Sequence, residues 1–322
     1  MEFNSKLTKE ICEVYGPTGR ESKVAEYIQN QIRDHVDEMW VDCLGNLIAH
    51  KKGNGKRVVL SAHMDQLGLM IKTIDEKGFA RIGQLGSIKP YNLIDSRIQT
   101  ESGVQGVMIC EKKEDMGKIT HNDLYIDFAT LSPEKVREKV RIGEVAITRS
   151  EYYENEECVM MQCLDDRIGC MIIIDSILRD VKNTNDMYYV FTVQEEIDLF
   201  VTFDVACTGD ELRGIRTDVK LGGGAGIKAM DYFMIVNQYV VDALVDIAEK
   251  NGIKYQIEVS ENGGTDAHTA QLVRGGMKAG AITIPTRNIH SRDEIICKED
   301  ILDCIRMAMA LETVELDEHF GA

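Results

Sequence analysis

Apolar residues follow two different periods along the chain, and the change divides it into three stretches. Val24, Ile28 and Ile32 recur at helical spacing after a turn that begins at Thr18. Residues 57–63 form a continuous apolar and β-branched run, which predicts a buried strand that ends at His63. The first stretch therefore has the character of an alternating α/β fold.

The pattern changes at residue 66. Short alternating segments at residues 69–74, 79–82, 106–110 and 144–148 are separated by turns rich in glycine and charge. Such segments are typical of a small β-barrel or sandwich, and a helical stretch at residues 132–140 lies near the end of this part. We therefore expect an inserted β domain at residues 66–159.

After residue 160 helical and strand patterns alternate again. Residues 168–178 are apolar on most faces, which predicts a helix buried all round. Strands are predicted at residues 187–193, 255–259 and 279–285, and helices at residues 233–250 and 298–316. The fold class is then α/β, with a mixed sheet and flanking helices. Residues 1–65 and 160–322 form this discontinuous domain, and the small β-barrel domain interrupts it.

Length and charge narrow the classes of function. The chain has 322 residues, of which 44% are hydrophobic, which is enough for about two domains. Its net charge of −17 argues against partners such as nucleic acid or an anionic membrane, because both require clusters of lysine and arginine. Solubility is the simpler explanation of the acidity. The functional alternative is attraction of cationic ligands, such as the free amino terminus of a peptide.

The nine cysteines are scattered and odd in number, without a CxxC pair. This favours a reducing cytosol and buried free thiols over a disulfide framework. The first residues carry charges throughout and lack the apolar core of a signal peptide. No run approaches the roughly 20 apolar residues of a membrane span. We therefore expect a cytoplasmic protein.

His63 and Asp65 follow the strand predicted at residues 57–63 and share one face of an extended chain. A histidine that binds a metal usually donates its other ring N–H to an acceptor, and a nearby carboxylate can serve. A structural histidine at the end of a core strand explains the pair equally well. The pair therefore does not decide the function alone.

Asp165 and Asp166 open the helix predicted at residues 168–178. Acidic residues at a helix start commonly cap it, and this is the stronger explanation for the two residues by themselves. In the functional alternative, one of them bridges two cations about 3.5–4 Å apart. Arg167 would then pair with the other.

Glu195 and Glu196 follow the apolar strand predicted at residues 187–193. Adjacent carboxylates at a buried strand end repel each other and are costly to desolvate, so cations are expected beside them. One can ligate a metal while the other acts as general base for the attacking water. An exposed strand end is the weaker alternative.

Asp204 follows a further apolar run and His290 follows the last predicted strand, so both are candidate end ligands. Each is more often structural when it occurs alone. Because ligands of α/β sheets bind at the carboxyl ends of the strands, the five clusters should meet there. Together they predict a two-metal hydrolytic site. The glycine-rich residues 221–228 lack the spacing of a phosphate-binding loop, so a flexible loop is the better interpretation.

These clusters and their surroundings resemble those of a known family, the glutamyl/deblocking aminopeptidases that assemble into tetrahedral dodecamers. Some members of that family carry a cellulase label. The resemblance covers nearly the whole chain. It rests on Gly-Pro-Thr-Gly-Arg-Glu (16–21), Asp42 with Gly45-Asn46-Leu47, Ser-Ala-His-Met-Asp (61–65), Leu-Tyr-Ile-Asp-Phe (124–128), Val-Arg-Ile-Gly (140–143), Leu-Asp-Asp-Arg-Ile-Gly (164–169), Val-Gln-Glu-Glu (193–196), Phe-Asp-Val (203–205), Gly-Gly-Thr-Asp-Ala (263–267) and Ile-Pro-Thr-Arg-Asn-Ile-His-Ser (284–291).

The resemblance implies a zinc-peptidase-like fold and a role for each cluster. The implied metal ligands are His63 and Asp204 on one ion, Glu196 and His290 on the other, and Asp165 between the two. Glu195 would be the general base, and Asp65 would orient His63. The ions would be Zn²⁺ or Co²⁺, because the nitrogen and oxygen ligands suit both. The substrates would be short peptides that lose their N-terminal amino acid, and the inserted domain would serve assembly into a homo-oligomer.

Two positions depart from the family pattern. Gln66 replaces a glutamate, which removes one charge and keeps the size of the side chain. After Glu196 the family continues with a helix and a new strand, whereas residues 197–203 alone lead to Asp204 here. Neighbouring parallel strands need a crossover of about a dozen residues or more. Either this is a natural deletion or the sequence as printed lacks a segment, and the intact remaining ligands favour the second explanation.

Two other hypotheses stay open. A natural deletion between Glu196 and Asp204 would favour a catalytically inactive assembly or binding protein on the same fold. A glycosidase that uses two carboxylates without metal is the third hypothesis. The clusters around His63 and His290 argue against it.

Overall fold

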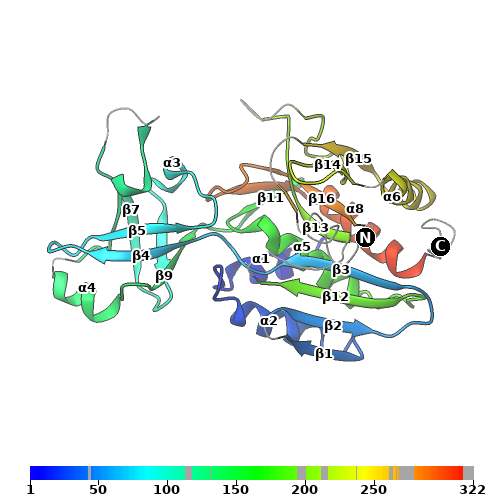
Figure 1. Cartoon of the computed structure of the whole chain (residues 1–322), viewed down its shortest axis with the longest axis horizontal. Coiled ribbons are helices and arrows are strands. Elements are labelled where there is room, and N and C mark those ends of the chain that lie inside the picture. The colour runs from blue at the N-terminus through cyan, green and yellow to red at the C-terminus, as the bar shows by residue number, and fades with distance from the viewer. Residues whose placement is uncertain are drawn as a thin grey trace.

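The structure is a computed structural model that describes residues 1–42, 45–112, 118–130, 132–193, 201–211, 217–236, 238–260, 264–265, 267 and 279–314. Figure 1 shows a large α/β body, which contains both chain ends, beside a smaller β-barrel. The chain enters the barrel after one strand of the body and returns to the body afterwards. The predicted fold class, a mixed α/β sheet interrupted by a small barrel, is confirmed.

The body is built on one large mixed sheet. Its strands are, in spatial order, β1 (Glu38–Val41), β2 (Leu47–Lys51), β12 (Asp186–Thr192), β3 (Arg57–His63), β13 (Val201–Cys207), β16 (Gly280–Arg287), β17 (Glu294–Cys297), β11 (Cys158–Met161) and β10 (Tyr153–Glu154), with β14 (Ala225–Met230) and β15 (Tyr255–Val259) branching from β16. The central strands β12, β3, β13 and β16 run parallel. Their carboxyl ends therefore meet at one edge, where ligands bind in sheets of this kind.

Strands β12 and β13 are not neighbours, because β3 lies between them and is parallel to both. Strand β13 pairs with β3 at Val201 and Thr202 and otherwise follows β16. The pair Val201–Leu60 fixes the register, so Asp204 and His63 both lie three residues further on. Residues 194–200, which connect β12 to β13, lie outside the described part of the chain. The expectation about a missing segment there stays a prediction.

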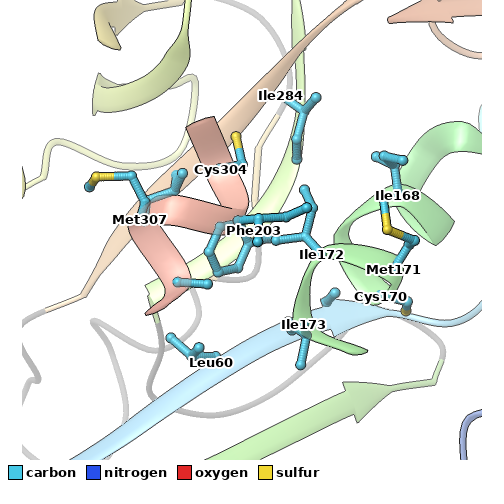
Figure 2. Packing of buried hydrophobic residues seen from close by; sticks show 14 of the residues in the cluster. Leu60, Ile168, Cys170, Met171, Ile172, Ile173, Phe203, Ile284, Cys304 and Met307 are labelled. Carbon is cyan, nitrogen blue, oxygen red and sulfur yellow. The ribbon is translucent and has the colours of Figure 1, made fainter. Parts of the chain in front are cut away.

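Helices α1 (Ser5–Glu13), α2 (Ser22–Ile32), α5 (Leu164–Leu178), α6 (Gln238–Lys250) and α8 (Lys298–Thr313) belong to the body. Helix α5 is buried all round, as its sequence predicted, and it packs against β3, β13 and α8. Figure 2 shows Ile172 of α5 beside Phe203 of β13 and close to Cys304 of α8. Burial of this helix fixes its first turn, which is also the turn that carries Asp165.

The barrel closes through strands β4 (Gly68–Ile74), β5 (Ala80–Leu85), β8 (Leu124–Asp127), β7 (Gln105–Cys110), β6 (Arg97–Thr100) and β9 (Val145–Arg149). Short helices α3 (Pro90–Leu93), η2 (His121–Asp123) and α4 (Pro133–Lys139) lie in its connections. Inward-facing residues such as Leu69, Ile82 and Ile126 fill it. The last barrel strand ends at Arg149, and residues 153–161 pair with the main sheet instead. The exact boundaries of the inserted domain, residues 66 and 159, remain a prediction.

The helix predicted at residues 233–250 is shorter than expected, because α6 begins at Gln238. The Asp231 carboxylate accepts the backbone N–H groups of Phe233 and Met234 at 2.9 and 2.8 Å. An aspartate that bonds nearby amides in this way offers the backbone an alternative to the helix. Gly252, with φ of 62°, ends α6 as the Asn-Gly signal predicted.

The glycine-rich residues 221–228 form neither a phosphate cradle nor a loosely held loop. The Asp300 carboxylate at the start of α8 accepts the N–H groups of Gly222 and Gly224, both at 2.7 Å. Gly224 has φ of 92°, and a Cβ there would meet the carbonyl of Lys254 at 2.3 Å. A carboxylate of the chain itself thus occupies the amides that a phosphate would need.

None of the helices described has the length and apolar character needed to cross a membrane. The cysteines in the described residues are all free thiols, as their scattered spacing predicted.

Candidate metal centre

His63, at the last position of β3, directs its two ring nitrogens toward two different carboxylates. Nδ1 lies 3.2 Å from the backbone oxygen of Asp65 and 3.3 Å from its Oδ1. Nε2 lies 3.1 Å from Oδ1 of Asp165. The other carboxylate oxygen of Asp65 accepts the hydroxyl of Thr18 at 2.7 Å. The predicted partner Asp65 therefore faces the nitrogen of His63 that points away from Asp165.

The pKa of Asp65 reflects these contacts. Burial alone would raise it, but the hydrogen bonding and charge of His63, together with the Thr18 hydroxyl, bring it below the ordinary value. A carboxylate that stays ionised beside Nδ1 favours a proton on that nitrogen. When the proton is on Nδ1, the lone pair of Nε2 is available to a cation, which would then replace the hydrogen bond between Nε2 and Asp165.

Asp165 and Asp166 have different roles, although they are adjacent at the start of α5. Asp166 caps the helix, because its Oδ1 accepts the N–H of Gly169 at 3.1 Å, and its Oδ2 accepts the N–H of His63 at 3.2 Å. Burial raises the pKa of Asp166 well above its ordinary value. Asp165 has non-helical backbone angles and does not cap. The capping explanation therefore holds for Asp166 alone.

Asp165 instead lies between two histidines. Its Oδ1 is 3.1 Å from Nε2 of His63, and its Oδ2 is 3.2 Å from Nε2 of His290. Burial alone would raise the pKa of Asp165, but hydrogen bonds with His290 and His63 hold it far below the ordinary value. A carboxylate with one oxygen directed to each of two histidines has the arrangement of a bridging ligand.

Asp204 completes a three-residue group with His63 and Asp165, in which one potential ligand atom of each lies within 4.8 Å of the others. Ligand atoms around a tetrahedral ion at about 2.1 Å are separated by roughly 3.4 Å, which lies within this limit. Neutral imidazole nitrogens and carboxylate oxygens are also the donors that Zn²⁺ and Co²⁺ accept. The residues present thus fit a divalent metal.

His290 belongs to a tight loop after β16. The N–H of Ser291 donates to the carbonyl of Asn288 at 3.1 Å, and both Asn288 and His290 have positive φ, at 59° and 60°. Left-handed conformations are uncommon for residues other than glycine and need surrounding support. The His290 side chain is 41% exposed, so it faces the open side of the centre.

Arg167 does not pair with either aspartate, which corrects the prediction. The fully buried guanidinium donates to the backbone carbonyls of Met64, Ile11, Val14 and Gly16 and to the side chain of Gln66. It therefore holds the chain before α2 against the end of β3. Gln66, the departure noted from the family pattern, lies 3.4 Å from it and supplies a neutral acceptor.

The centre lies in a cleft of about 810 Å³ between the barrel and the sheet edge. Lys89 and Tyr91 line the barrel side, while Asp204, Lys228 and Glu258 line the body side. Nζ of Lys228 is 3.0 Å from Oε1 of Glu258. Burial alone would lower the pKa of Lys228, but Glu258 and Asp204 raise it above its ordinary value. This lysine is a cation that the sequence patterns did not single out.

Five of the seven predicted site residues lie in the described part of the chain. Glu195 and Glu196 lie outside the described residues, so their proposed roles are not tested. His63, Asp65, Asp165, Asp204 and His290 come together at the sheet edge from β3, the start of α5, β13 and the loop after β16. The sequence patterns missed Glu294, which lies beside Asp165 and His290. Its signal was its position four residues after a candidate ligand and just before an apolar strand.

Comparison with known proteins assigns the chain to one family. The sequence model of the M42 glutamyl aminopeptidase family matches residues 45–307. The lysyl aminopeptidase of Pyrococcus furiosus is 31% identical over 334 residues, which cover 95% of this chain and 96% of that protein. An aminopeptidase structure from the archaeon Desulfurococcus kamchatkensis is similar with a TM-score of 0.91 at 29% identity, over 98% of this chain and 97% of that one.

A further similar structure concerns assembly. The TET1 peptidase of Pyrococcus horikoshii, described as able to assemble into a tetrahedron or a large octahedral shell, matches with a TM-score of 0.82 at 28% identity. The match covers 96% of this chain and 98% of that one. The likeness therefore extends over both the body and the barrel.

Proposed function

The chain belongs to the M42 family of glutamyl aminopeptidases and is a peptide hydrolase, and from this premise we propose that it removes N-terminal amino acids from short peptides with two divalent metal ions. The arrangement of Asp165 is the observation that supports the two-metal site most directly. Its two carboxylate oxygens face two histidines from opposite ends of the chain. A single-metal site would need no such carboxylate between them.

In this proposal His63 and Asp204 would hold one ion, His290 and Glu196 would hold the other, and Asp165 would be a ligand of both. When bound, the ions would lower the pKa of the attacking water and polarise the scissile carbonyl. Zn²⁺ and Co²⁺ are the candidates, since the donors suit both.

The chain's own side chains would carry the proton. Glu195, outside the described residues, would accept a proton from the attacking water and return it to the leaving amine. Asp65 would keep the proton of His63 on Nδ1, since it faces that nitrogen at 3.3 Å. The acidic groups of the cleft, with Lys228 already neutralised by Glu258, suit the ammonium group of a peptide's amino terminus.

We also propose that the protein forms a homo-oligomer through its barrel, up to the dodecamer that the sequence resemblance implies. The support is the shell assembly described for the TET1 peptidase, whose likeness includes the barrel. The free described thiols suit a reducing cytoplasm.

The test is the variant Glu195→Gln, assayed with aminoacyl substrates of glutamate, leucine and lysine. We expect hydrolysis to fall by about 10²–10⁴-fold, because a general base is removed, while the metal content stays at two ions per chain. Glu111→Gln, which changes an exposed barrel glutamate, is the matched control and should keep full activity. Chelation should abolish hydrolysis, and Zn²⁺ or Co²⁺ should restore it.

Two results would contradict the proposal. Wild-type protein that carries two metal ions per chain yet hydrolyses none of the peptides would favour the inactive homologue. Hydrolysis of glucans that persists after chelation would favour the glycosidase. The intact mass of the protein, measured by mass spectrometry, would show whether a segment is missing between Glu196 and Asp204, because such a segment would make the protein heavier than the printed sequence.

A further inference from the structure

Glu294, at the start of β17, lies between two parts of the proposed centre. Its side chain is buried, with the residue 2% exposed. Oε2 accepts the backbone N–H of Asp165 at 3.0 Å, and Oε1 accepts the backbone N–H of His290 at 2.8 Å. One carboxylate therefore joins the bridging aspartate to the histidine loop, although it contacts neither ligand's side chain in these bonds.

The sheet register explains how Glu294 reaches both amides. Glu294 pairs with Met161 across strands β17 and β11. Asp165 lies four residues after Met161, and His290 lies four residues before Glu294. The two ligands thus leave the same point of the sheet in opposite chain directions. A side chain at the paired position can therefore reach both backbones.

The His290 loop is held from two sides. His290 and Asn288 both have left-handed backbone angles, which are uncommon outside glycine but are adopted more readily by asparagine and histidine than by other residues. Glu294 accepts the N–H of His290, and Asn92 of helix α3 donates to the backbone carbonyl of His290 at 3.2 Å. The loop is therefore fixed on one side by the body and on the other by the barrel.

We propose that Glu294 is a positioning residue whose carboxylate sets the separation and orientation of Asp165 and His290. It rests on the proposed function, since it assumes that these two side chains share a metal site. Asp166 holds the backbone of His63 in the same manner, so each histidine of the centre has its own buried carboxylate. Groups that hydrogen-bond the side chains of metal ligands typically contribute 10–100-fold to metal affinity or activity, and Glu294 would act on the same ligands through their backbones.

The variant Glu294→Gln tests the proposal, because the two backbone N–H groups bond different oxygens of Glu294, and glutamine replaces one of these oxygens with an NH2 group that can only donate. Titration of the metal-free protein with Co²⁺, followed by visible absorption, should show one site about 10–100-fold weaker than in the wild type. The peptidase kcat should fall at limiting Co²⁺ and recover at high Co²⁺, with KM within about twofold. Glu312→Gln, an identical change at a buried site beside Tyr189, is the matched control and should leave the Co²⁺ titration unchanged.

Wild-type Co²⁺ affinity at both sites in Glu294→Gln overturns the proposal, and so does equal weakening in Glu312→Gln. If Glu294→Gln does not fold, the Co²⁺ titration of the variant Glu294→Asp tests the proposal instead. It keeps the charge but is one methylene shorter, so it should also bind Co²⁺ more weakly, and wild-type affinity in it overturns the proposal. The Co²⁺ titrations need no peptide, so they stay informative if the wild-type enzyme hydrolyses none and the proposed function fails.

Discussion

The barrel and the α/β body bury different kinds of side chain. Apolar residues fill the barrel, and among its described residues Asp123 is the one buried carboxylate. The body buries several charged groups besides its larger apolar core: Asp166, Arg167, Lys228, Glu294 and Glu312. Buried charges are costly unless they are paired or hydrogen-bonded. Their concentration in the body indicates a task that apolar packing does not perform.

That task is to hold backbone in positions that the sheet does not fix. Asp166, Glu294 and Arg167 each bond to backbone groups of segments that carry or adjoin candidate ligands. In the barrel the closed hydrogen-bond ladder satisfies the strands, and carboxylates such as Asp123 and Glu144 accept backbone N–H groups of the connections between them. We therefore expect damage to the barrel core to reduce stability, and damage to the buried charges to reduce metal binding.

The largest effect is expected from matched cavities in the two cores. Leu69→Ala in barrel strand β4 and Leu60→Ala in body strand β3 each truncate a fully buried leucine, and each should cost about 2–5 kcal/mol of folding free energy. Thermal unfolding followed by circular dichroism would measure the loss. At temperatures where both variants are folded, Co²⁺ binding should weaken in Leu60→Ala alone, because β3 carries His63. Equal weakening of Co²⁺ binding in both variants would show that damage to the barrel core also disturbs the metal centre.

A smaller effect concerns the pH dependence of the body. Burial raises the pKa of Glu312 to about 7. Below the ordinary carboxyl pKa both folded and unfolded states hold the proton, so folding pays no cost there. As the pH rises from the ordinary carboxyl pKa to about 7, the unfolded chain releases the proton while the folded protein keeps it, so stability falls by up to about 3 kcal/mol and is then level above pH 7. Glu312→Gln should lose this dependence and exceed the wild type at pH 9, with equal stability near pH 4. A pH-independent difference between the two proteins would contradict this.

The smallest effect is expected where the two regions meet. Asn92→Ala removes the barrel's hydrogen bond to the carbonyl of His290, which is worth about 1 kcal/mol. Co²⁺ affinity or kcat should therefore fall about fivefold, measured by titration and by peptide hydrolysis. Asn122→Ala, at an exposed barrel position, should change neither. An unchanged Asn92→Ala would mean that the barrel shapes the cleft but does not support the histidine loop.

Local patterns predicted much of the fold, because burial on one face or on all faces leaves a period in the sequence. The all-apolar stretch of α5, the strand that ends at His63 and four barrel strands were predicted in this way. Barrel strands β6 and β8 were missed, since each has only four residues. The predicted start of the helix at residue 233 was wrong, because the Asp231 side chain bonds the backbone there and α6 begins at Gln238.

The sequence alone determined which residues could carry chemistry and on which kind of element each lies. Their chemical types and their positions after apolar runs are local properties, and these suffice to predict metal ligands. The tertiary structure decided that Asp165 faces both histidines while Asp166 caps a helix, that Arg167 bonds to carbonyls, and that Glu294 joins two ligands. Apart from the Asp166 cap, which spans three residues, these relations depend on strand register between segments more than a hundred residues apart, and no local period records that register.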